Sequence, residues 1–499
     1  MTSVDVRSPW RGVNTGAMLA IVFAVVQRIS CTVTGYQCPR KIQSNVKRMT
    51  LVMSRSKICC FGVICTLMVA VTSVRAEEVE ALEARIAKLE SELVALRSIV
   101  EALLPPSGDN AVLPTPEQVV AVNEPQRPPR SSGPGEGFSY QGFIQLDTLL
   151  SDYSDGRPNG SAIEDFLIPS DIPVAADGAS GFRSTNMSAK TTRFAFATDH
   201  LTSAGRVSSL LELDFALSSQ GNERISNSWS SRLRHAYVDW QLSEQNSLLA
   251  GQTWTTFMRA EARPALWDMT GSVGQSFNRQ PLIRWRHNRW SLAAENPATR
   301  LEGVPYEREQ RAVPDLVVRY DGETGALGWT VAGLLRQLNY REERQGEATR
   351  EDEVMGYALS FAGNWQTGAN DFRFMLNYGD ALGRYMGLNA FNDGVVTADG
   401  SIRTFDQFGG LISWSRRFSP RWQAGVALSG AWADVPGEDV YDAAGLMPES
   451  YATGHFNLWY RPTPSLALGS EYIRAVKRLE NGNSGSLDRL MLSVRYNLK

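Results

Sequence analysis

The chain has 499 residues, of which 43% are hydrophobic and 21% are charged, with 50 Lys and Arg against 53 Asp and Glu. This composition excludes a disordered chain, and the net charge of -3 excludes the strong basic bias of a protein that coats nucleic acid. After residue 76 no stretch approaches the roughly 20 uninterrupted apolar residues that a transmembrane helix takes. Any membrane span would therefore consist of strands.

The N-terminal region predicts export from the cytoplasm. Residues 49–76 have the pattern of a secretory signal peptide, in which two basic residues precede an apolar stretch from Ile58 to Val71 and small residues end at Ala76. A short membrane anchor is the alternative. We expect residues 1–48 to be an upstream extension from a misassigned start codon, because they carry no periodic pattern. All five cysteines lie in the first 65 residues, so the exported protein would form no disulfide or thiolate metal site.

The charged residues of the exported part are biased toward arginine. Residues 1–76 hold ten basic and one acidic side chain, so their removal leaves 40 basic and 52 acidic side chains and a net charge of -12. Only four of these 40 are lysines, namely Lys88, Lys190, Lys477 and Lys499. The guanidinium of arginine binds carboxylate and phosphate through two parallel hydrogen bonds, so this bias bears on the ligand.

Residues 77–104 predict a coiled-coil oligomerisation helix. Apolar side chains follow one another at spacings that alternate between three and four residues, at Val79, Leu82, Ile86, Leu89, Leu93, Leu96, Val100 and Leu103. A lone amphipathic helix packed on a domain is the alternative, and the heptad rule alone favours two strands over three. Residues 105–137, rich in proline, glycine and polar side chains, predict an extended linker.

Residues 138–499 predict a transmembrane β-barrel. Almost every stretch of about ten residues alternates between apolar and polar side chains and is bounded by turn residues. The connections alternate between short and long, as in outer-membrane barrels, and their number gives about sixteen antiparallel strands. The expected fold is thus an all-β transmembrane barrel preceded by a coiled-coil helix on the periplasmic side. A soluble sandwich is the alternative, although it follows no such rule of connection length. In RLRHAYVDWQL the apolar side chains switch from one face of the strand to the other partway along it, which predicts a bulge near Ala236.

If the apolar face contacts lipid, the opposite face lines the lumen. By this parity the candidate pore-lining and solute-binding residues are Arg193, Arg206, Arg232, Arg234, Arg284, Arg286, Arg319 and Arg373. Charges around a narrow pore of low dielectric constant can attract anions even where the net charge is negative. The alternative is that these arginines merely pair with inward acidic residues such as Glu212, Asp214 and Glu295. Outward tryptophans near strand ends (Trp290, Trp329, Trp414, Trp422 and Trp459) predict an aromatic girdle at the membrane surface.

The long connection after the fifth strand, FMRAEARPALWDMTGSVGQSFNR, is the candidate constriction loop. Its candidate constriction residues are Arg259, Glu261, Arg263 and Asp268, and we expect Trp267 to anchor the loop against the inner wall. An ordinary outer loop is the alternative.

The order of these segments resembles the DcaP-like trimeric porins of Gram-negative outer membranes. The resemblance rests on the heptad helix, the linker, GFSYQGFIQLD at the start of the barrel, and then RLRHAYVDW, LLAGQTWTTFM and RQPLIRW. It implies three barrels with a channel each, a trimeric stalk in the periplasm, and uptake of small anions such as dicarboxylates. The expected partners are therefore outer-membrane lipid, two further copies of the chain and small anionic solutes.

The sequence contains no catalytic motif of the HExxH, Walker or GxSxG type, so we expect a channel without enzymatic activity, cofactor or metal. Two other functions stay open. One is a structural barrel that tethers the envelope through its stalk, and the other is an outer-membrane hydrolase using His235.

Overall fold

The computed structural model describes residues 137–498, apart from 159, 161, 176–178, 218–225, 306–307, 311–312, 344–348 and 438–439. The upstream extension, the signal peptide, the coiled-coil helix and residues 105–136 of the linker lie outside the described residues. The described residues are therefore those of the predicted barrel, together with Gly137.

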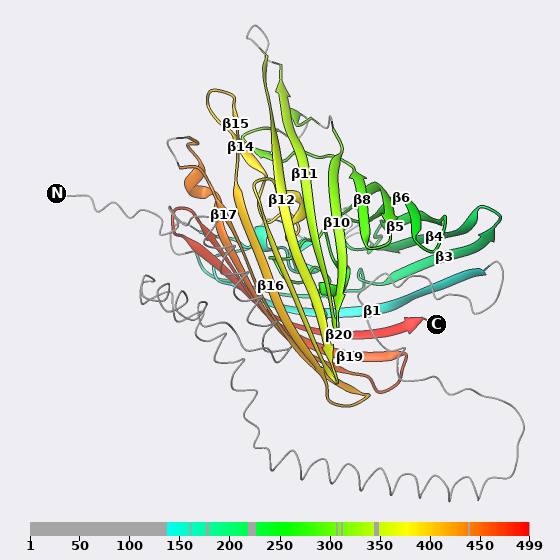
Figure 1. Ribbon diagram of the computed structural model, residues 1–499. Coiled ribbons are helices and arrows are strands. Elements are labelled where there is room, and N and C mark those ends of the chain that lie inside the picture. Colours follow the sequence, from blue (N-terminus) through cyan, green and yellow to red (C-terminus); the bar gives the residue numbers. More distant parts are fainter. Residues whose placement is uncertain are drawn as a thin grey trace, which may run out of the picture. The chain divides into compact units, whose positions relative to one another are not determined.

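Strands dominate the described part of the chain (Figure 1). They are β1 (Gly137–Tyr153), β2 (Phe182–Ser188), β3 (Arg193–Thr202), β4 (Gly205–Asp214), β5 (Arg232–Gln241), β6 (Asn246–Trp254), β7 (Arg279–His287), β8 (Trp290–Glu295), β9 (Leu301–Glu302), β10 (Asp315–Thr324), β11 (Leu327–Glu342), β12 (Arg350–Thr367), β13 (Asn370–Gly379), β14 (Gly394–Val396), β15 (Ile402–Thr404), β16 (Asp406–Arg417), β17 (Trp422–Asp434), β18 (Pro448–Tyr460), β19 (Leu466–Leu479) and β20 (Ser484–Leu498).

The wall is a closed antiparallel barrel of sixteen strands, as the sequence predicted. Each wall strand pairs with the next in the chain, and β1 closes the ring by pairing with β20. The first half of β1 pairs with β3 and its second half with β2, so β2 and β3 are two parts of one wall strand. Strands β9, β14 and β15 form a separate small sheet in the loops.

The two ends of the barrel differ in the length of their connections. At one end, called here the turn end, seven links of two to five residues join the strands, and β1 begins and β20 ends there. The other end, called the loop end, holds the long connections. Two of its eight links are shorter than expected. Residues 343–349 join β11 to β12, and residues 480–483 join β19 to β20.

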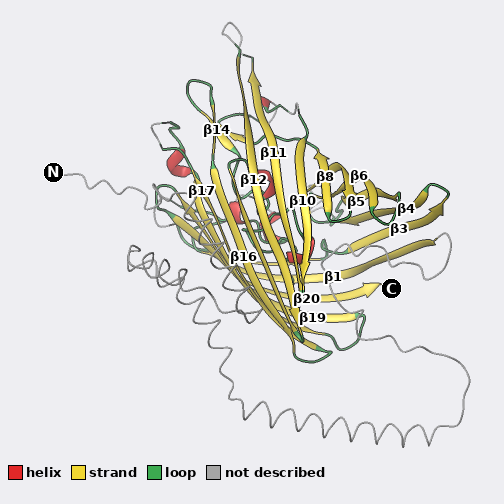
Figure 2. Ribbon diagram, viewed as in Figure 1, coloured by secondary structure: helices red, strands yellow, loops and turns green. Residues whose placement is uncertain are grey.

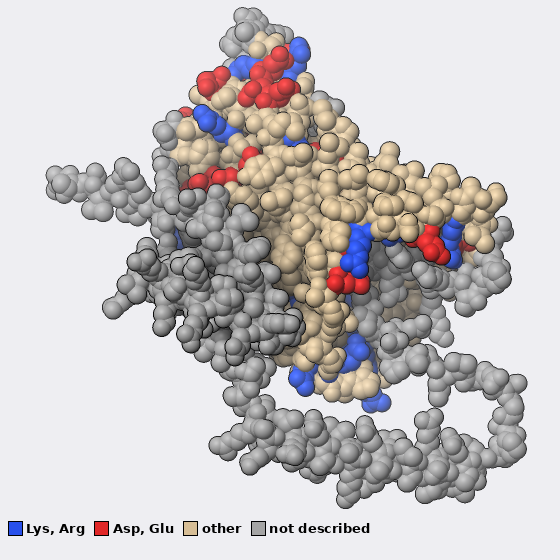
Figure 3. Space-filling model, viewed as in Figure 1, with Lys and Arg blue, Asp and Glu red and all other residues tan. Residues whose placement is uncertain are grey.

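The outer face of the wall is apolar and the inner face is polar. On β20, the side chains of Leu490, Leu492, Val494 and Tyr496 are 39–52% exposed, whereas those of Arg489, Met491, Ser493 and Arg495 between them are at most 3% exposed. Figure 3 shows the result on one side of the barrel, where a band largely free of charged side chains lies between two charged rims. Such a band fits the hydrocarbon layer of a membrane.

The predicted bulge lies in β5, at Arg234 rather than at Ala236. Glu212 of β4 pairs with His235 while the next residue, Leu213, pairs with Leu233, so Arg234 is the extra residue. As a result Arg234 and His235 are both buried on the inner side.

The helices of the described residues are single 3-10 turns in the loops (Figure 2): η2 (Ala162–Glu164), η3 (Pro169–Asp171), η4 (Ala260–Ala262), η6 (Gly383–Tyr385) and η7 (Ala444–Leu446). In this part of the chain, none has the length and apolar character that a membrane crossing by a helix would take.

Candidate functional site

The connection between β6 and β7, residues 255–278, lies inside the barrel. Most of its side chains are buried, and it forms hydrogen bonds with strands far from β6 and β7. The backbone amide of Trp267 donates to Glu471 Oε2 on β19 at 2.6 Å, and Asn377 Nδ2 on β13 donates to the Gly274 carbonyl at 3.0 Å. The loop therefore crosses the lumen, and we call it the inward loop.

The tip of the inward loop is anchored by an aromatic stack. The ring of Trp267 lies on that of Trp459 with centroids 3.7 Å apart, and its Nε1 donates to the Leu458 carbonyl at 3.2 Å. Gly469 of β19 leaves room for the ring, since a Cβ there would lie 1.9 Å from it. The expected anchor thus lies against the inner wall. The expectation that Trp459 faces outward is wrong, because Trp459 is 3% exposed and points into the barrel.

The four predicted constriction residues differ in exposure. Glu261 has half of its side chain exposed, whereas that of Arg259 is 12% exposed and donates to Asn364 Oδ1 at 2.8 Å. Arg263 is buried over the rings of Trp254 and Phe277.

Asp268, the fourth of these residues, has a different contact. It is 1% exposed and accepts from the backbone amides of Leu167, Thr270 and Gly271, so it shapes the turn of the inward loop.

Three predicted lumen arginines gather on neighbouring strands around two carboxylates. Arg234 lies 2.5 Å from Glu212 and 3.0 Å from Asp214, and Arg232 contacts Asp214 at 2.8 Å. Arg193 lies 3.6 Å from Glu212.

A fourth arginine, Arg279 of β7, lies close enough to these three arginines to interact with them electrostatically. It stacks over Trp254 at 4.4 Å, and its buried Nη1 has no hydrogen-bond partner among the described residues. It was not predicted from the sequence, although it occupies the first position of the strand that holds Arg284 and Arg286. We call Arg193, Arg232, Arg234 and Arg279 the arginine wall.

The remaining predicted arginines lie nearer the turn end. Three contact carboxylates on their own or a neighbouring strand: Arg206 with Asp199, Arg319 with Asp321 at 2.7 Å, and Arg373 with Asp371 at 2.7 Å. Arg284 instead donates to Thr256 Oγ1 and to the Trp254 carbonyl, at 2.8 and 2.7 Å. Arg286 shares the inward parity of Arg284. At least six of the eight predicted arginines thus have an ion-pair partner among the described residues of the wall.

Arg495 of β20 is a second inward arginine that was not predicted from the sequence. It is fully buried, and rings of Phe143, Trp267 and Trp459 lie 4.3, 5.0 and 5.6 Å from its guanidinium carbon. Its Nε donates to Gln145 Oε1, while Nη1 and Nη2 have no hydrogen-bond partner among the residues described. The alternation of β20 could have revealed it, because its neighbours Val494 and Tyr496 face outward.

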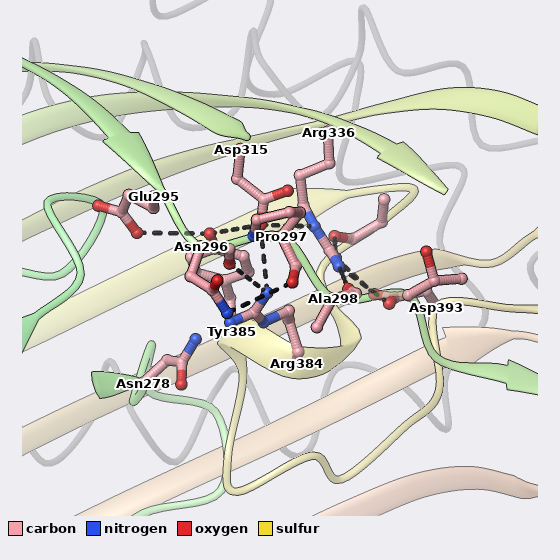
Figure 4. Close-up of polar contacts among 12 residues, drawn as sticks. Asn278, Glu295, Asn296, Pro297, Ala298, Asp315, Arg336, Arg384, Tyr385 and Asp393 are labelled. Atoms are coloured by element: carbon pink, nitrogen blue, oxygen red, sulfur yellow. Dashed lines mark hydrogen bonds and ion pairs between the residues drawn. The ribbon is translucent and has the colours of Figure 1, made fainter. Parts of the chain in front are cut away.

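A second loop, residues 380–405, also folds inward and is fixed by a buried ion network (Figure 4). Arg336 of β11 lies between Asp315 at 3.2 Å and Asp393 at 2.7 Å, and it also donates to the carbonyls of Ala298 and Ala381. The hydroxyl of Tyr385 donates to Asp315 at 2.7 Å.

Burial shifts the pKa values of two loop residues of this network. Burial raises the pKa of Tyr385, so that its hydroxyl stays protonated and can donate. Burial lowers the pKa of Arg384, which nevertheless donates to the Asn296 carbonyl at 2.8 Å. The network therefore holds the second loop against β8, β10 and β11 as a structural element.

Two of the four histidines are buried and contact polar side chains of neighbouring strands. His235 Nδ1 contacts Thr253 Oγ1 at 3.0 Å, and His455 Nδ1 contacts Glu471 Oε1 at 2.9 Å. Within the described ranges, no three His, Cys, Asp or Glu side chains lie together in a way that could hold a metal ion.

The closed sixteen-stranded wall, the apolar belt and the inward loop define an outer-membrane β-barrel of porin fold. The model of the DcaP outer membrane protein family matches residues 168–498, so the chain belongs to that family and to the outer membrane.

A solved channel structure supports this fold. The outer membrane channel DcaP of Acinetobacter baumannii has 18% sequence identity, with 73% of this chain and 98% of that chain covered and a TM-score of 0.59. Outer-membrane expressed OmpT of Vibrio cholerae (9% identity, 73% and 99% covered, TM-score 0.43) and Salmonella typhi OmpF (9%, 73% and 98%, 0.44) also match. A search of curated proteins found no match.

Proposed function

We propose that the protein is a passive diffusion channel for small hydrophilic solutes and that it prefers anions, such as the dicarboxylates implied by the family resemblance. The observation that carries the proposal is the arginine wall. Four guanidinium groups lie close enough there to interact electrostatically, while among the described residues only Glu212 and Asp214 form ion pairs with them.

A surplus of positive charge matters because of where it lies. The arginine wall lies on the inner side of the barrel beside the inward loop, and Arg193 and Arg234 are largely buried there. Charges beside a narrow passage of low dielectric constant act on ions more strongly than charges on an open surface. Part of the negative charge of the chain is already balanced locally, since Asp199, Asp321 and Asp371 of the wall each contact an arginine.

No step of the proposed function is chemical. An anion would enter through the loop end, pass the arginine wall beside the inward loop and leave through the turn end, driven by its concentration gradient. The expectation that the protein is not an enzyme stays a prediction.

We further propose that three chains assemble through the helix of residues 77–104, with the stalk in the periplasm. The heptad spacing of that helix supports an oligomer, and the family resemblance favours three chains over two. Cross-linking of the purified protein in detergent would give a ladder ending at three chains, and deletion of residues 77–104 would reduce it to one.

The test of anion preference is a reversal potential in a salt gradient, measured on single channels in a planar bilayer. Anion selectivity supports the proposal. Cation selectivity would indicate that the arginines only pair with acidic residues of the wall. A bilayer without conductance would favour the alternative of a structural barrel that tethers the envelope.

A further inference from the structure

Outside the arginine wall, a cavity of about 240 Å³ lies at the loop end. Four long connections and the loop-end parts of β18 and β19 meet there. Ligand pockets for drug-sized molecules usually measure about 300–1,000 Å³, so this cavity fits a smaller solute.

One side of the cavity carries an acidic group. Glu302 belongs to β9, which pairs with β14, and its Oε1 accepts a hydrogen bond from Asn392 Nδ2 at 2.7 Å. Among the described residues it has no ion-pair partner within 4.0 Å. Its negative charge is therefore available to a cation.

Another part of the lining carries a basic group. Lys477 Nζ of β19 donates to the Ser170 carbonyl at 2.7 Å. An ammonium group has three protons to donate, so two remain for a ligand. No carboxylate in the described ranges lies within 4.0 Å of Lys477, although Asp171 interacts with it electrostatically over a longer distance.

The lining of the cavity also includes aromatic and apolar side chains. Phe391, Phe405 and Met447 are among them and are largely buried, and Tyr451 packs edge-on against Phe391 with ring centroids 5.1 Å apart. Tyr451 is 1% exposed, and its hydroxyl has no hydrogen-bond partner among the described side chains and backbone groups. A buried hydroxyl without a partner is costly, which points to a ligand or water that supplies one.

We propose that this cavity binds a small zwitterion with an apolar body, of which an aromatic α-amino acid is the simplest example. Lys477 binds the carboxylate, Glu302 binds the ammonium group, and the side chain lies against Phe391 and Phe405. The site goes beyond the proposed channel function, because binding here depends neither on conduction nor on the arginine wall.

The first test is calorimetric titration of the full chain, purified in detergent, with three compounds. L-phenylalanine carries both charges, 3-phenylpropionate lacks the ammonium group and 2-phenylethylamine lacks the carboxylate. A hydrogen bond to a charged group contributes about 1.5–3 kcal/mol, so each analogue should bind roughly ten to a hundred times more weakly than L-phenylalanine. Equal binding of the three compounds, or no heat with any of them, would overturn the proposal.

Two variants assign the charges. Glu302→Gln should weaken L-phenylalanine and 2-phenylethylamine but leave 3-phenylpropionate unchanged, and Lys477→Met should do the reverse. The control is Glu351→Gln, which removes a carboxylate whose side chain is 60% exposed on β12 and lies outside the cavity lining. If Glu302→Gln and Glu351→Gln bind all three compounds alike, Glu302 holds no ammonium group and the proposal fails.

Bilayer recording on the same preparation separates this proposal from the channel function. Binding of L-phenylalanine by a protein that does not conduct would contradict the channel and support the cavity. Anion-selective conduction without L-phenylalanine binding would contradict only the cavity. Should either variant fail to fold, the comparison of the three compounds on the unaltered chain still decides.

Discussion

Trp267 of the inward loop stacks on Trp459 of β18 with ring centroids 3.7 Å apart and planes 18° apart. One ring belongs to a loop and the other to the barrel wall, so the stack fixes how far the loop reaches across the lumen. The carboxylate of Glu471 adds a hydrogen bond to the Trp267 amide, and His455 in turn contacts Glu471. We therefore expect the width of the passage to depend on this buried contact, which lies outside the arginine wall.

Replacing the anchor should widen the channel. We expect Trp267→Ala to raise single-channel conductance and its noise, because the loop tip loses its aromatic contact. Loss of a buried tryptophan costs about 3–5 kcal/mol, so the midpoint of heat unfolding in detergent should also fall. Trp414→Ala, on the outer face, is the control for loss of a tryptophan. Unchanged conductance would show that the tip does not limit the passage.

The same anchor can be disturbed from the wall. Gly469→Ala places a methyl group 1.9 Å from the Trp267 ring, so the ring must move and conductance should rise without any change in the loop sequence. Gly454→Ala of β18 is the matched control, because its added Cβ meets only Leu428 at 3.5 Å, an ordinary contact. Equal conductance of the two variants would contradict the role of the stack.

The arginine wall should set ion selectivity. Arg279→Met keeps an apolar stem against Trp254 and removes one positive charge, so the reversal potential should shift toward cations while the barrel still folds. Arg474→Met makes the same charge change at an exposed pair with Asp488 and should leave selectivity unaltered. A shift of the same size in both variants would assign selectivity to net charge instead.

The buried ion network should determine stability at the loop end. Arg336→Met leaves Asp315 and Asp393 buried without their main partner, which costs about 3–5 kcal/mol for a broken buried pair. We expect easier proteolysis of the loop of residues 380–405 and a lower unfolding midpoint. Protease resistance equal to that of the unaltered protein would show that the loop is held by its apolar contacts alone.

Stability should also vary with pH through Glu480, in the loop-end connection between β19 and β20. Partial burial and the carboxylates of Glu449 and Asp434 raise the pKa of Glu480 from 4.5 to about 7. A raised pKa means that the folded state binds the proton more tightly, so the stabilising contribution is full below pH 4.5 and is lost as the pH rises through 7.

The change is expected to be small, because the Glu480 side chain is largely exposed and solvent screens its neighbours. The unfolding midpoint should be higher at pH 5 than at pH 8, and Glu480→Gln should reduce that difference. Glu351→Gln serves as the control. A pH dependence that is the same in both variants would assign it to other groups.

Alternation and connection length were enough to predict the barrel and its number of strands, because a wall with lipid on one side and water on the other imposes period two on every strand. They also placed Arg193, Arg232 and Arg234 on the inner face. Their ion partners depend on register and on the bulge at Arg234, which the sequence indicated only to within two residues.

The errors have a common physical cause. Trp459 was expected to face lipid because aromatic residues usually do so in barrels, but the inward loop gives it an apolar partner inside. Arg336 was missed because its role depends on Asp393, a residue of a loop whose inward path no local pattern reveals. A loop that folds into a barrel offers an apolar partner on the inner side. Wall residues that contact such a loop can therefore depart from the rule that aromatic side chains face lipid.

The most direct measurement is the reversal potential of single channels formed by the mature protein in a planar bilayer under a salt gradient. We predict conductance in steps of three and an anion-selective potential that Arg279→Met diminishes. A cation-selective potential, or one that Arg279→Met does not alter, would contradict the claim that the arginine wall selects the solute.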